Sequence, residues 1–228
     1  MPKLSIIIPA YNEQATIAKV LQEVLTQSTF DWEKEILVIN DGSQDKTEEA
    51  LSPFLSQIRY LKNEKNLGKG ASIARAIDAA SGDAVIIQDA DLEYHPKEFP
   101  QMLDALSDPE VQIVYGSREL KPKRRGYPHY VIGVWILTKV TNLLHGGNLT
   151  DVYTGYKLFR TPVARSMRIS SSGFEVEAEI TIKALQNKYK IKEVPIDYFP
   201  RSFAEGKKIG LRDWFKGLYT IVKHKFIK

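Results

Sequence analysis

Two carboxylates, Asp89 and Asp91, stand one residue apart directly after a short apolar run. That run, Ala84-Val85-Ile86-Ile87, is typical of a strand buried on both faces of a sheet. Carboxylates at the end of such a strand are costly to bury and need a cation or hydrogen-bond donors. Open α/β sheets bind their ligands at this end of parallel strands. The pattern indicates either a divalent metal site for a phosphorylated substrate or a loop with solvated acids.

Further polar segments follow other apolar runs. Pro9-Ala10-Tyr11-Asn12-Glu13 follows a strand predicted at 4–8, and Asp41-Gly42-Ser43 follows one predicted at 35–39. The segment 65–70 contains lysines and two glycines at the start of a predicted helix, where the helix dipole favours anions. No Gly-x-Gly-x-x-Gly follows the first strand, and the chain has no Gly-x-x-x-x-Gly-Lys-Ser/Thr phosphate loop. Dehydrogenase and nucleoside-triphosphatase functions are therefore disfavoured.

Strands and amphipathic helices alternate through the first half of the chain. The hydrophobic pattern predicts strands at 4–8, 35–39, 58–61, 84–89 and 112–115. It predicts helices at 17–25, from Gln44 to about Pro53, at 70–80 with Gly82 as the stop, and from Pro96 onward. This β-α-β-α order implies an α/β fold with a mostly parallel, doubly wound sheet, whose carboxyl ends bring the polar segments together.

The second half of the chain is more helical. Helices are predicted at 128–145, 174–189 and 211–228, with a strand at 190–198. The apolar stripe around Trp135 favours core packing over a lipid-facing role. The last helix combines an apolar face containing Leu211 and Trp214 with basic residues elsewhere, which suits either core packing or a membrane surface. The basic residues of 121–125 and those beyond Arg201 suggest an anionic partner, and without interleaved aromatic residues they do not favour nucleic acid.

The composition is that of a soluble globular protein. The 228 residues, 43% hydrophobic and 26% charged, suit one domain spanning 1–228. The absence of cysteine excludes disulfides, thiolate metal sites and cysteine nucleophiles, so that carboxylates would have to hold a metal, with Mg²⁺ or Mn²⁺ favoured. The amino terminus is predicted to be a strand rather than a signal peptide, and no segment has the roughly 20 apolar residues of a membrane helix. We therefore expect a cytoplasmic protein.

In their order along the chain, these motifs resemble the inverting family 2 glycosyltransferases of the GT-A fold. The matching segments are 8–13, 41–43, 66–70 and Asp89-Ala90-Asp91-Leu92. In the second half the segments 116–118, 151–157, 174–177, 194–196 and 201–209 are similar to the dolichol-phosphate mannose synthase and polyprenyl-phosphate glucosyltransferase branch. The resemblance implies transfer of mannose or glucose from a nucleotide-sugar, GDP-mannose or UDP-glucose, to a polyprenyl or dolichyl phosphate.

The resemblance also implies roles for individual residues. Asp91 and Glu93 would hold Mg²⁺ or Mn²⁺; Glu93 stands where the mannose synthases usually have a neutral Gln, so this site has an additional negative charge. Arg201 and Lys207 would clamp the diphosphate, and Arg118 would hold the acceptor phosphate. With Asp91, these three residues are the expected catalytic groups. The nucleotide pocket would be lined by Pro9, Tyr11, Glu13, Asp41, Lys69, Asp89 and Ala90.

The acceptor decides whether a general base is needed. A polyprenyl phosphate is already anionic near neutral pH, whereas a sugar hydroxyl must lose a proton as it attacks, and Glu175 or Glu177 could take it. A family 2 enzyme of cell-wall, capsule or lipopolysaccharide synthesis that acts on a hydroxyl is therefore the alternative function. A nucleotide-sugar-binding or membrane-recruited module is a non-enzymatic alternative. For a lipid acceptor, we expect peripheral attachment to the cytoplasmic face of the membrane, or an integral-membrane partner, in place of the anchors of many relatives.

Overall fold

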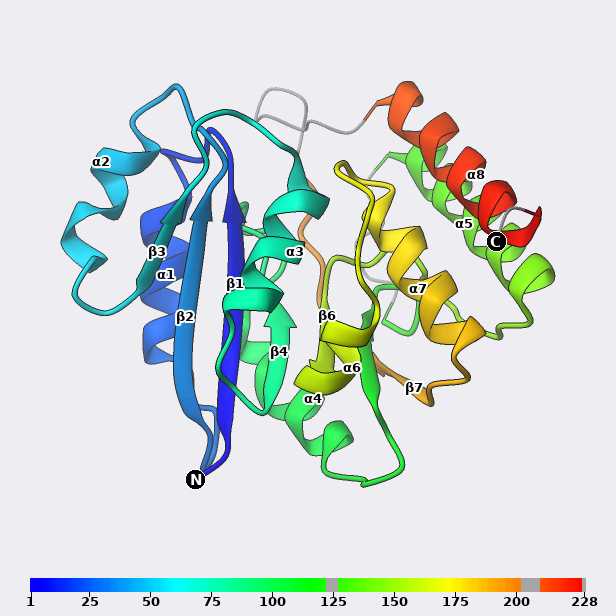
Figure 1. Ribbon diagram of the computed structural model, residues 1–228, viewed down its shortest axis with the longest axis horizontal. Coiled ribbons are helices and arrows are strands. Elements are labelled where there is room, and N and C mark those ends of the chain that lie inside the picture. Colours follow the sequence, from blue (N-terminus) through cyan, green and yellow to red (C-terminus); the bar gives the residue numbers. More distant parts are fainter. Residues whose placement is uncertain (122–126, 202–209, 227–228) are drawn as a thin grey trace.

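The computed structural model describes residues 1–121, 127–201 and 210–226. Within these residues the strands form one seven-stranded sheet in the order β3-β2-β1-β4-β6-β5-β7 (Figure 1). The strands are β1 (Lys3–Ala10), β2 (Glu33–Asn40), β3 (Arg59–Lys62), β4 (Ala84–Ile87), β5 (Ile113–Ser117), β6 (Lys157–Arg160) and β7 (Ile191–Pro195). The helices are α1 (Ile17–Thr26), α2 (Thr47–Leu51), α3 (Lys69–Ala79), α4 (Phe99–Leu106), α5 (Pro128–His145), α6 (Thr161–Ser166), α7 (Val176–Gln186) and α8 (Leu211–Phe226), with 3₁₀ turns η1 (Ser52–Phe54) and η2 (Pro96–Glu98).

The sheet is mostly parallel, as predicted. β1 pairs in parallel with both β2 and β4, β2 with β3, and β5 with β7. The exception is β6, which lies between β4 and β5 and runs antiparallel to both. β6 and the following α6 were not predicted, because a four-residue strand with a basic residue at each end has neither a long apolar run nor a clear alternation.

Helices cover both faces of the sheet. On one face, α1, α2 and α4 pack on the apolar side chains of β1, β2 and β4. On the other face α3, α6 and α7 cover a second cluster that includes Tyr115 and Phe159. Beyond α7, the helices α5 and α8 lie side by side (Figure 1), and a third cluster around Leu137 and Ile221 joins them to α7. Because β1, β2 and β4 run parallel, their carboxyl ends lie at one edge of the sheet.

Several predicted boundaries are wrong by a few residues. The helix expected from Gln44 begins at Thr47, because the amides of residues 43, 44 and 46 instead donate to the side chains of Asn40, Asn12 and Gln14. Gly82 does not stop α3, which ends at Ala79. Gly82 instead lies against β1, where a Cβ would come within 2.7 Å of the Lys3 carbonyl oxygen. The predicted helix 174–189 and strand 190–198 are also shorter in the structure.

The stripe around Trp135 does not pack in the core. Trp135 is 57% exposed, and Ile132 and Leu143 of the same helix are also exposed. On α8, Trp214 and Ile221 pack inward, whereas Phe215, 62% exposed, faces solvent together with Leu211, Tyr219, Val222 and Phe226. The expectation of core packing is therefore wrong for Trp135 and holds for only part of α8. Among the described residues, no helix is both long and apolar enough to cross a membrane.

Candidate active site

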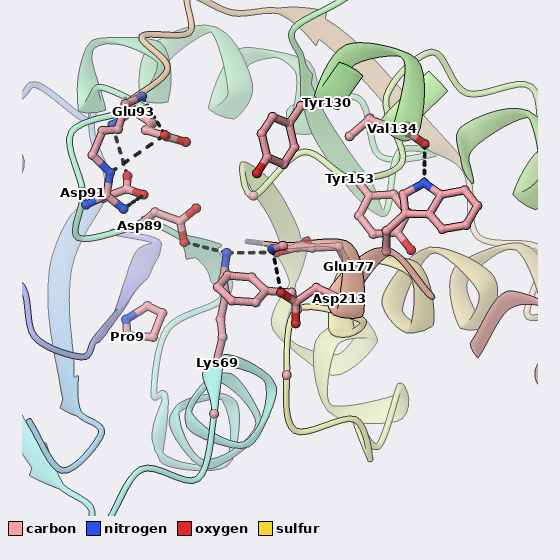
Figure 2. A pocket seen from close by; sticks show the side chains of 18 of the residues that line it. Pro9, Lys69, Asp89, Asp91, Glu93, Tyr130, Val134, Tyr153, Glu177 and Asp213 are labelled. Atoms are coloured by element: carbon pink, nitrogen blue, oxygen red, sulfur yellow. Dashed lines mark hydrogen bonds and ion pairs between the residues drawn. The ribbon is translucent and has the colours of Figure 1, made fainter. Parts of the chain in front are cut away.

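A pocket of about 870 Å³ opens at the carboxyl edge of the sheet, beneath α5 and α8. Figure 2 shows part of its lining, from Pro9 on one side to Val134 and Tyr153 on the other. Every site residue predicted from the sequence lines this pocket except Lys207, which lies outside the described residues. The lining residues from that prediction are Pro9, Tyr11, Glu13, Asp41, Lys69, Asp89, Ala90, Asp91, Glu93, Arg118 and Arg201.

Asp41 shapes one end of the pocket. Its Oδ1 accepts hydrogen bonds from Asn63 Nδ2 (2.6 Å) and the Leu67 amide (2.9 Å), and its Oδ2 accepts one from the Gly68 amide (2.8 Å). Gly68 has a φ of 96°, and a Cβ there would clash with the Ser172 carbonyl oxygen. Asp41 therefore fixes the segment that leads into α3, so that a ligand at this end meets a wall already ordered by the chain.

A buried chain of alternating charges forms the floor. Lys69 Nζ lies 2.7 Å from Asp89 Oδ1 and 3.0 Å from Glu177 Oε1, and Glu177 Oε2 accepts a hydrogen bond from Lys157. Burial disfavours the charged form of Glu177, but the two ammonium groups outweigh it and hold the pKa of Glu177 below its ordinary value. An ionised carboxylate shared by two lysines is a weak proton acceptor. Glu177 is therefore poorly suited to the role of general base.

A second cluster gathers Asp91, Glu93 and Glu13 around the Arg201 guanidinium. Arg201 Nη2 is 2.8 Å from Asp91 Oδ2, Nη1 is 3.2 Å from Glu13 Oε2, and Nε is 3.8 Å from Glu93 Oε1. Leu92, between the two acids, has a φ of 61°, a strained value for a leucine that turns both carboxylates toward the same side. Burial and the neighbouring charges of Asp89 and Glu93 raise the pKa of Asp91 to about 7, against the opposing effect of Arg201.

This cluster supplies the ligand type that Mg²⁺ and Mn²⁺ prefer. Asp91 and Glu93 present carboxylate oxygens in one small, largely buried space, and a guanidinium already neutralises them there. In the described part of the chain, no group of three or more His, Asp or Glu residues is arranged to hold a metal by itself. The donor set thus fits a hard divalent cation that takes its remaining ligands from phosphate oxygens and water, as Mg²⁺ usually does.

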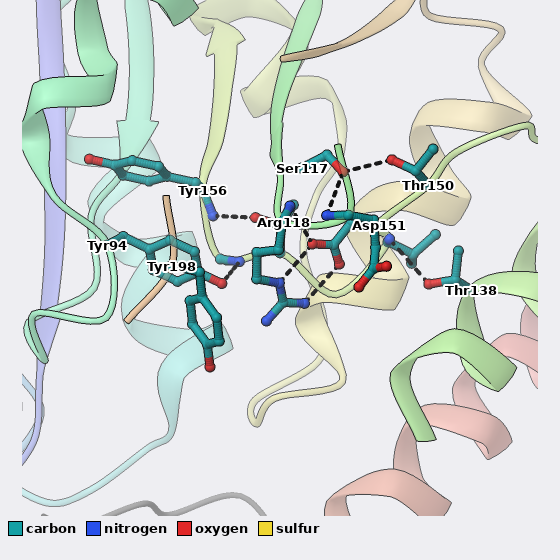
Figure 3. A network of polar contacts seen from close by, with 12 residues as sticks. Tyr94, Ser117, Arg118, Thr138, Thr150, Asp151, Tyr156 and Tyr198 are labelled. Atoms are coloured by element: carbon teal, nitrogen blue, oxygen red, sulfur yellow. Dashed lines mark hydrogen bonds and ion pairs between the residues drawn. The ribbon is translucent and has the colours of Figure 1, made fainter. Parts of the chain in front are cut away.

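Arg118 is held by a partner that the site prediction omitted (Figure 3). Asp151 accepts hydrogen bonds from Arg118 Nε and Nη2, each at 2.7 Å, and from the Arg118 amide at 3.1 Å. The Arg118 guanidinium also lies 5.1 Å from the centre of the Tyr198 ring. Burial opposes ionisation of Asp151, but Arg118 dominates and lowers the pKa of Asp151. The only signal in the sequence was the resemblance of 151–157, since the two residues are far apart along the chain.

The far side of the pocket is apolar. It runs between α5 and α8 and is lined by side chains that include Ile132, Ile136, Leu211 and Phe215. Trp214 joins the two helices by a hydrogen bond from its Nε1 to the Gly133 carbonyl oxygen (3.0 Å). The same pocket thus combines a charged floor with an apolar arm that reaches the exposed faces of two helices.

The combination is that of a nucleotide-sugar transferase of the GT-A type: a mostly parallel sheet, carboxylates at its strand ends, and two arginines that are each bound to a carboxylate. The family model for glycosyl transferase family 2 matches residues 5–168, and the chain belongs to this family. The match runs from β1 to α6 and includes every described site residue that the sequence predicted except Arg201. The expected family and fold are therefore confirmed.

Two curated relatives show which branch of the family the chain resembles. The chain is 27% identical over 97% of its length to a dolichol-phosphate mannosyltransferase of Pyrococcus furiosus, covering 64% of that protein. It is 28% identical over 96% of its length to the dolichyl-phosphate beta-glucosyltransferase ALG5A of Trichomonas vaginalis, covering 72% of that protein. The resemblance to the dolichol-phosphate branch is thus confirmed. The chain spans between 33% and 64% of the length of three curated relatives, the Pyrococcus protein among them.

Solved structures confirm the fold. A crystal structure of glucosyl-3-phosphoglycerate synthase from Mycobacterium tuberculosis, in complex with Mn²⁺, UDP-glucose and phosphoglyceric acid, matches 100% of this chain and 81% of that chain. The TM-score is 0.78 and the sequence identity 21%. A second structure of that synthase, in complex with Mg²⁺ and UDP, matches with a TM-score of 0.74 at 21% identity, over 100% of this chain and 80% of that one.

Proposed function

We propose that this protein transfers a hexose from a nucleotide-sugar to a polyprenyl phosphate, with inversion at the anomeric carbon. One observation supports this most directly: a single pocket contains carboxylates and Arg201 at one end, Arg118 beside its centre, and an apolar arm between α5 and α8. A nucleoside diphosphate with a divalent cation suits the first part. A phosphate attached to a long apolar chain suits the other two. The names of the relatives agree with this acceptor class.

The arrangement accounts for transfer without a general base. An acceptor phosphate would lie against Arg118, whose Nη1 is not used by Asp151 and whose bidentate pairing keeps the guanidinium in place. Arg201 would turn from the acids to the diphosphate and stabilise the charge that grows on the leaving group. Mg²⁺ or Mn²⁺ held by Asp91 and Glu93 would neutralise the diphosphate. The chain's own residues would therefore orient the acceptor phosphate and the diphosphate of the donor and lower the repulsion between these two anionic groups.

The alternative, a sugar hydroxyl as acceptor, is not favoured. It requires a base near the reacting carbon, and Glu177 is an ionised partner of Lys69 and Lys157 with a lowered pKa. Glu175, the other candidate, is not among the residues that line the pocket. The apolar side chains between α5 and α8 also offer few hydrogen-bond partners to a small polar acceptor.

We further propose that the exposed faces of α5 and α8 bind the cytoplasmic surface of a membrane. Trp135 and Phe215 are more than half exposed and lie on neighbouring helices beside the apolar arm. Inserting each ring into the lipid interface would contribute about 1.5 kcal/mol, roughly 60% of the value for a fully buried aromatic side chain. Contact at this face would let a lipid acceptor enter the pocket without leaving the bilayer.

The test combines purified protein, Mg²⁺ or Mn²⁺, labelled UDP-glucose or GDP-mannose, and vesicles with or without polyprenyl phosphate. We expect label in the lipid fraction only when polyprenyl phosphate is present. Arg118→Met should abolish this label, whereas Arg165→Met, which alters an arginine bonded to the Ala80 carbonyl away from the pocket, should not. Transfer to soluble sugars but never to the lipid would contradict the proposal. A Trp135→Ser, Phe215→Ser variant should bind vesicles about 100-fold less tightly at unchanged stability.

A further inference from the structure

The ammonium group of Lys157 is buried beneath the pocket and lines neither end of it. Lys157 begins β6 and has no exposed surface. Its Nζ donates hydrogen bonds to the carbonyl oxygens of Val152 and Thr154 and to Glu177, and lies 4.9 Å from the centre of the Tyr115 ring. A buried ammonium is unfavourable unless all its donors are used. The donors of Lys157 bond to two different segments, the loop that contains Val152 and Thr154 and the helix α7 that contains Glu177. This indicates that Lys157 joins the two segments.

One of these segments leads to the donor side of the pocket. From Lys157 the charges alternate through Glu177 and Lys69 to Asp89, with 3.0 Å between the Glu177 and Lys69 atoms and 2.7 Å between those of Lys69 and Asp89. Glu177 is 4% exposed, so little solvent reaches its contacts with the two lysines. The position of the Asp89 carboxylate therefore depends on the far end of this chain.

The other segment leads to the acceptor side. The carbonyls of Val152 and Thr154 belong to the loop 151–156, which begins with the carboxylate that grips Arg118 (Figure 3). The same loop approaches the donor side at Gly155, where a Cβ would clash with the Asp89 carboxylate. Lys157 thus holds a loop that contacts both Arg118, through Asp151, and Asp89.

We propose that Lys157 is a positioning residue that keeps the Arg118 guanidinium and the Asp89 carboxylate in a fixed position relative to each other. The inference rests on the proposed function, in which Asp89 serves the donor and Arg118 the acceptor phosphate. Transfer requires the reacting atoms to approach to about 3–3.5 Å, and a displacement of about 1 Å can cost a factor of 100 in rate. An ammonium that is hydrogen-bonded both to the loop and to Glu177 limits such a displacement.

The experiment compares Lys157→Met/Glu177→Gln, which removes both charges of this buried ion pair, with Glu177→Gln, which removes the carboxylate and keeps the Lys157 ammonium. In Glu177→Gln, Lys157 still bonds to both loop carbonyls. Hydrogen exchange is followed at the amides of the loop 151–156 and at Arg118, whose amide donates to Asp151. Transfer kcat and the KM for the nucleotide-sugar are measured alongside. Lys34→Met is the matched control, because Lys34 Nζ also binds backbone carbonyls, those of 24, 25 and 27 at the end of α1, away from the pocket.

Relative to Glu177→Gln, we expect the double variant to exchange these loop amides at least tenfold faster and to lose at least 30-fold in kcat, with donor KM within threefold. Lys34→Met should lower the melting temperature and leave kcat unchanged. If the double variant matches Glu177→Gln in exchange and in kcat, Lys157 only neutralises Glu177 and the inference is wrong. Should the double variant not fold, Lys157→Arg replaces it. We then expect loop exchange and transfer to change together, because the larger guanidinium does not fit the place of the buried ammonium. A change in one alone, or in neither, overturns the inference.

The two proposals fail in different ways. If the wild-type protein transfers no hexose to polyprenyl phosphate, the proposed function is wrong. The exchange comparison still decides the role of Lys157 in that case, because it needs no substrate. Loop amides that exchange at the same rate in Glu177→Gln and in the double variant would then overturn the inference, and a tenfold difference would support it.

Discussion

Removing the Arg201 guanidinium should change metal binding and catalysis in opposite directions. In the structure this group occupies the place of a cation among Asp91, Glu93 and Glu13, with its closest contact, 2.8 Å, to Asp91. A divalent ion that binds Asp91 and Glu93 must first displace it. The same guanidinium is the proposed clamp on the diphosphate, so that its loss should also remove a stabilising charge from the transition state.

The structure sets the size of both effects. A hydrogen bond to a charged group contributes about 1.5–3 kcal/mol, and one such bond, that to Asp91, must break when the metal binds. Arg201→Met should therefore bind Mn²⁺ alone about 10- to 100-fold more tightly than the wild type. Loss of one donor that stabilises developing negative charge typically costs about 10²–10³ in kcat. Transfer should fall by that factor.

Calorimetry with Mn²⁺ in the absence of nucleotide measures the first effect, and single-turnover transfer with saturating nucleotide-sugar measures the second. Arg165→Met serves as the control for loss of a positive charge elsewhere and should alter neither. Weaker Mn²⁺ binding by Arg201→Met would refute the reasoning. It would mean that the arginine holds the carboxylates in the arrangement that the metal needs, instead of occupying the metal's place.

Three further outcomes can be checked separately. Asp151→Asn should lower kcat/KM for the polyprenyl phosphate at least tenfold with unchanged nucleotide affinity, in kinetics at varied acceptor, because Arg118 loses half of its bidentate partner. Gly155→Ala should weaken UDP or GDP binding at least tenfold in calorimetry, because the new Cβ displaces the Asp89 carboxylate. Burial raises the pKa of Glu179, but hydrogen bonds from an ammonium and two serines outweigh it and lower that pKa to about 2. This stabilisation is complete above the unfolded value near 4.5 and is lost as the pH falls toward 2. Urea unfolding of Glu179→Gln should show a loss of about 2 kcal/mol at pH 7 and little at pH 2.

Part of the site could be predicted from the sequence, because the topology of a parallel sheet determines where residues that follow its strands must lie. A run such as 84–87 is buried on both faces, so it predicts a central parallel strand, and the acids after it must reach the carboxyl edge of the sheet. The same reasoning applies to Glu13 after β1 and to Asp41 after β2. Their meeting in one pocket required parallel strands whose carboxyl ends share one edge of the sheet, which the alternation of strands and helices implied.

The acceptor side did not follow in this way. It depends on β6, whose short length and charged ends concealed it, and on a lysine that hydrophobic patterning would place at the surface. Asp151 reaches Arg118 only because the chain returns antiparallel beside β5. The exposure of Trp135 was also hidden, since an apolar stripe looks the same whether it faces a core or a lipid. These features depend on contacts between residues that are far apart along the chain, and a single sequence does not reveal such contacts.

Four acids in or beside this pocket share one property: each is already paired with a cation of the same chain. The pairs are Asp89–Lys69, Asp91–Arg201, Asp151–Arg118 and Glu177–Lys157. Separating a buried pair leaves an uncompensated charge, which costs several kcal/mol. A ligand that brings only one sign of charge must therefore break a pair, whereas a diphosphate together with a divalent cation can exchange partners with Asp91 and Arg201 at once. Binding at this site is then an exchange of ion pairs, and it favours the joint arrival of metal and nucleotide over either one alone.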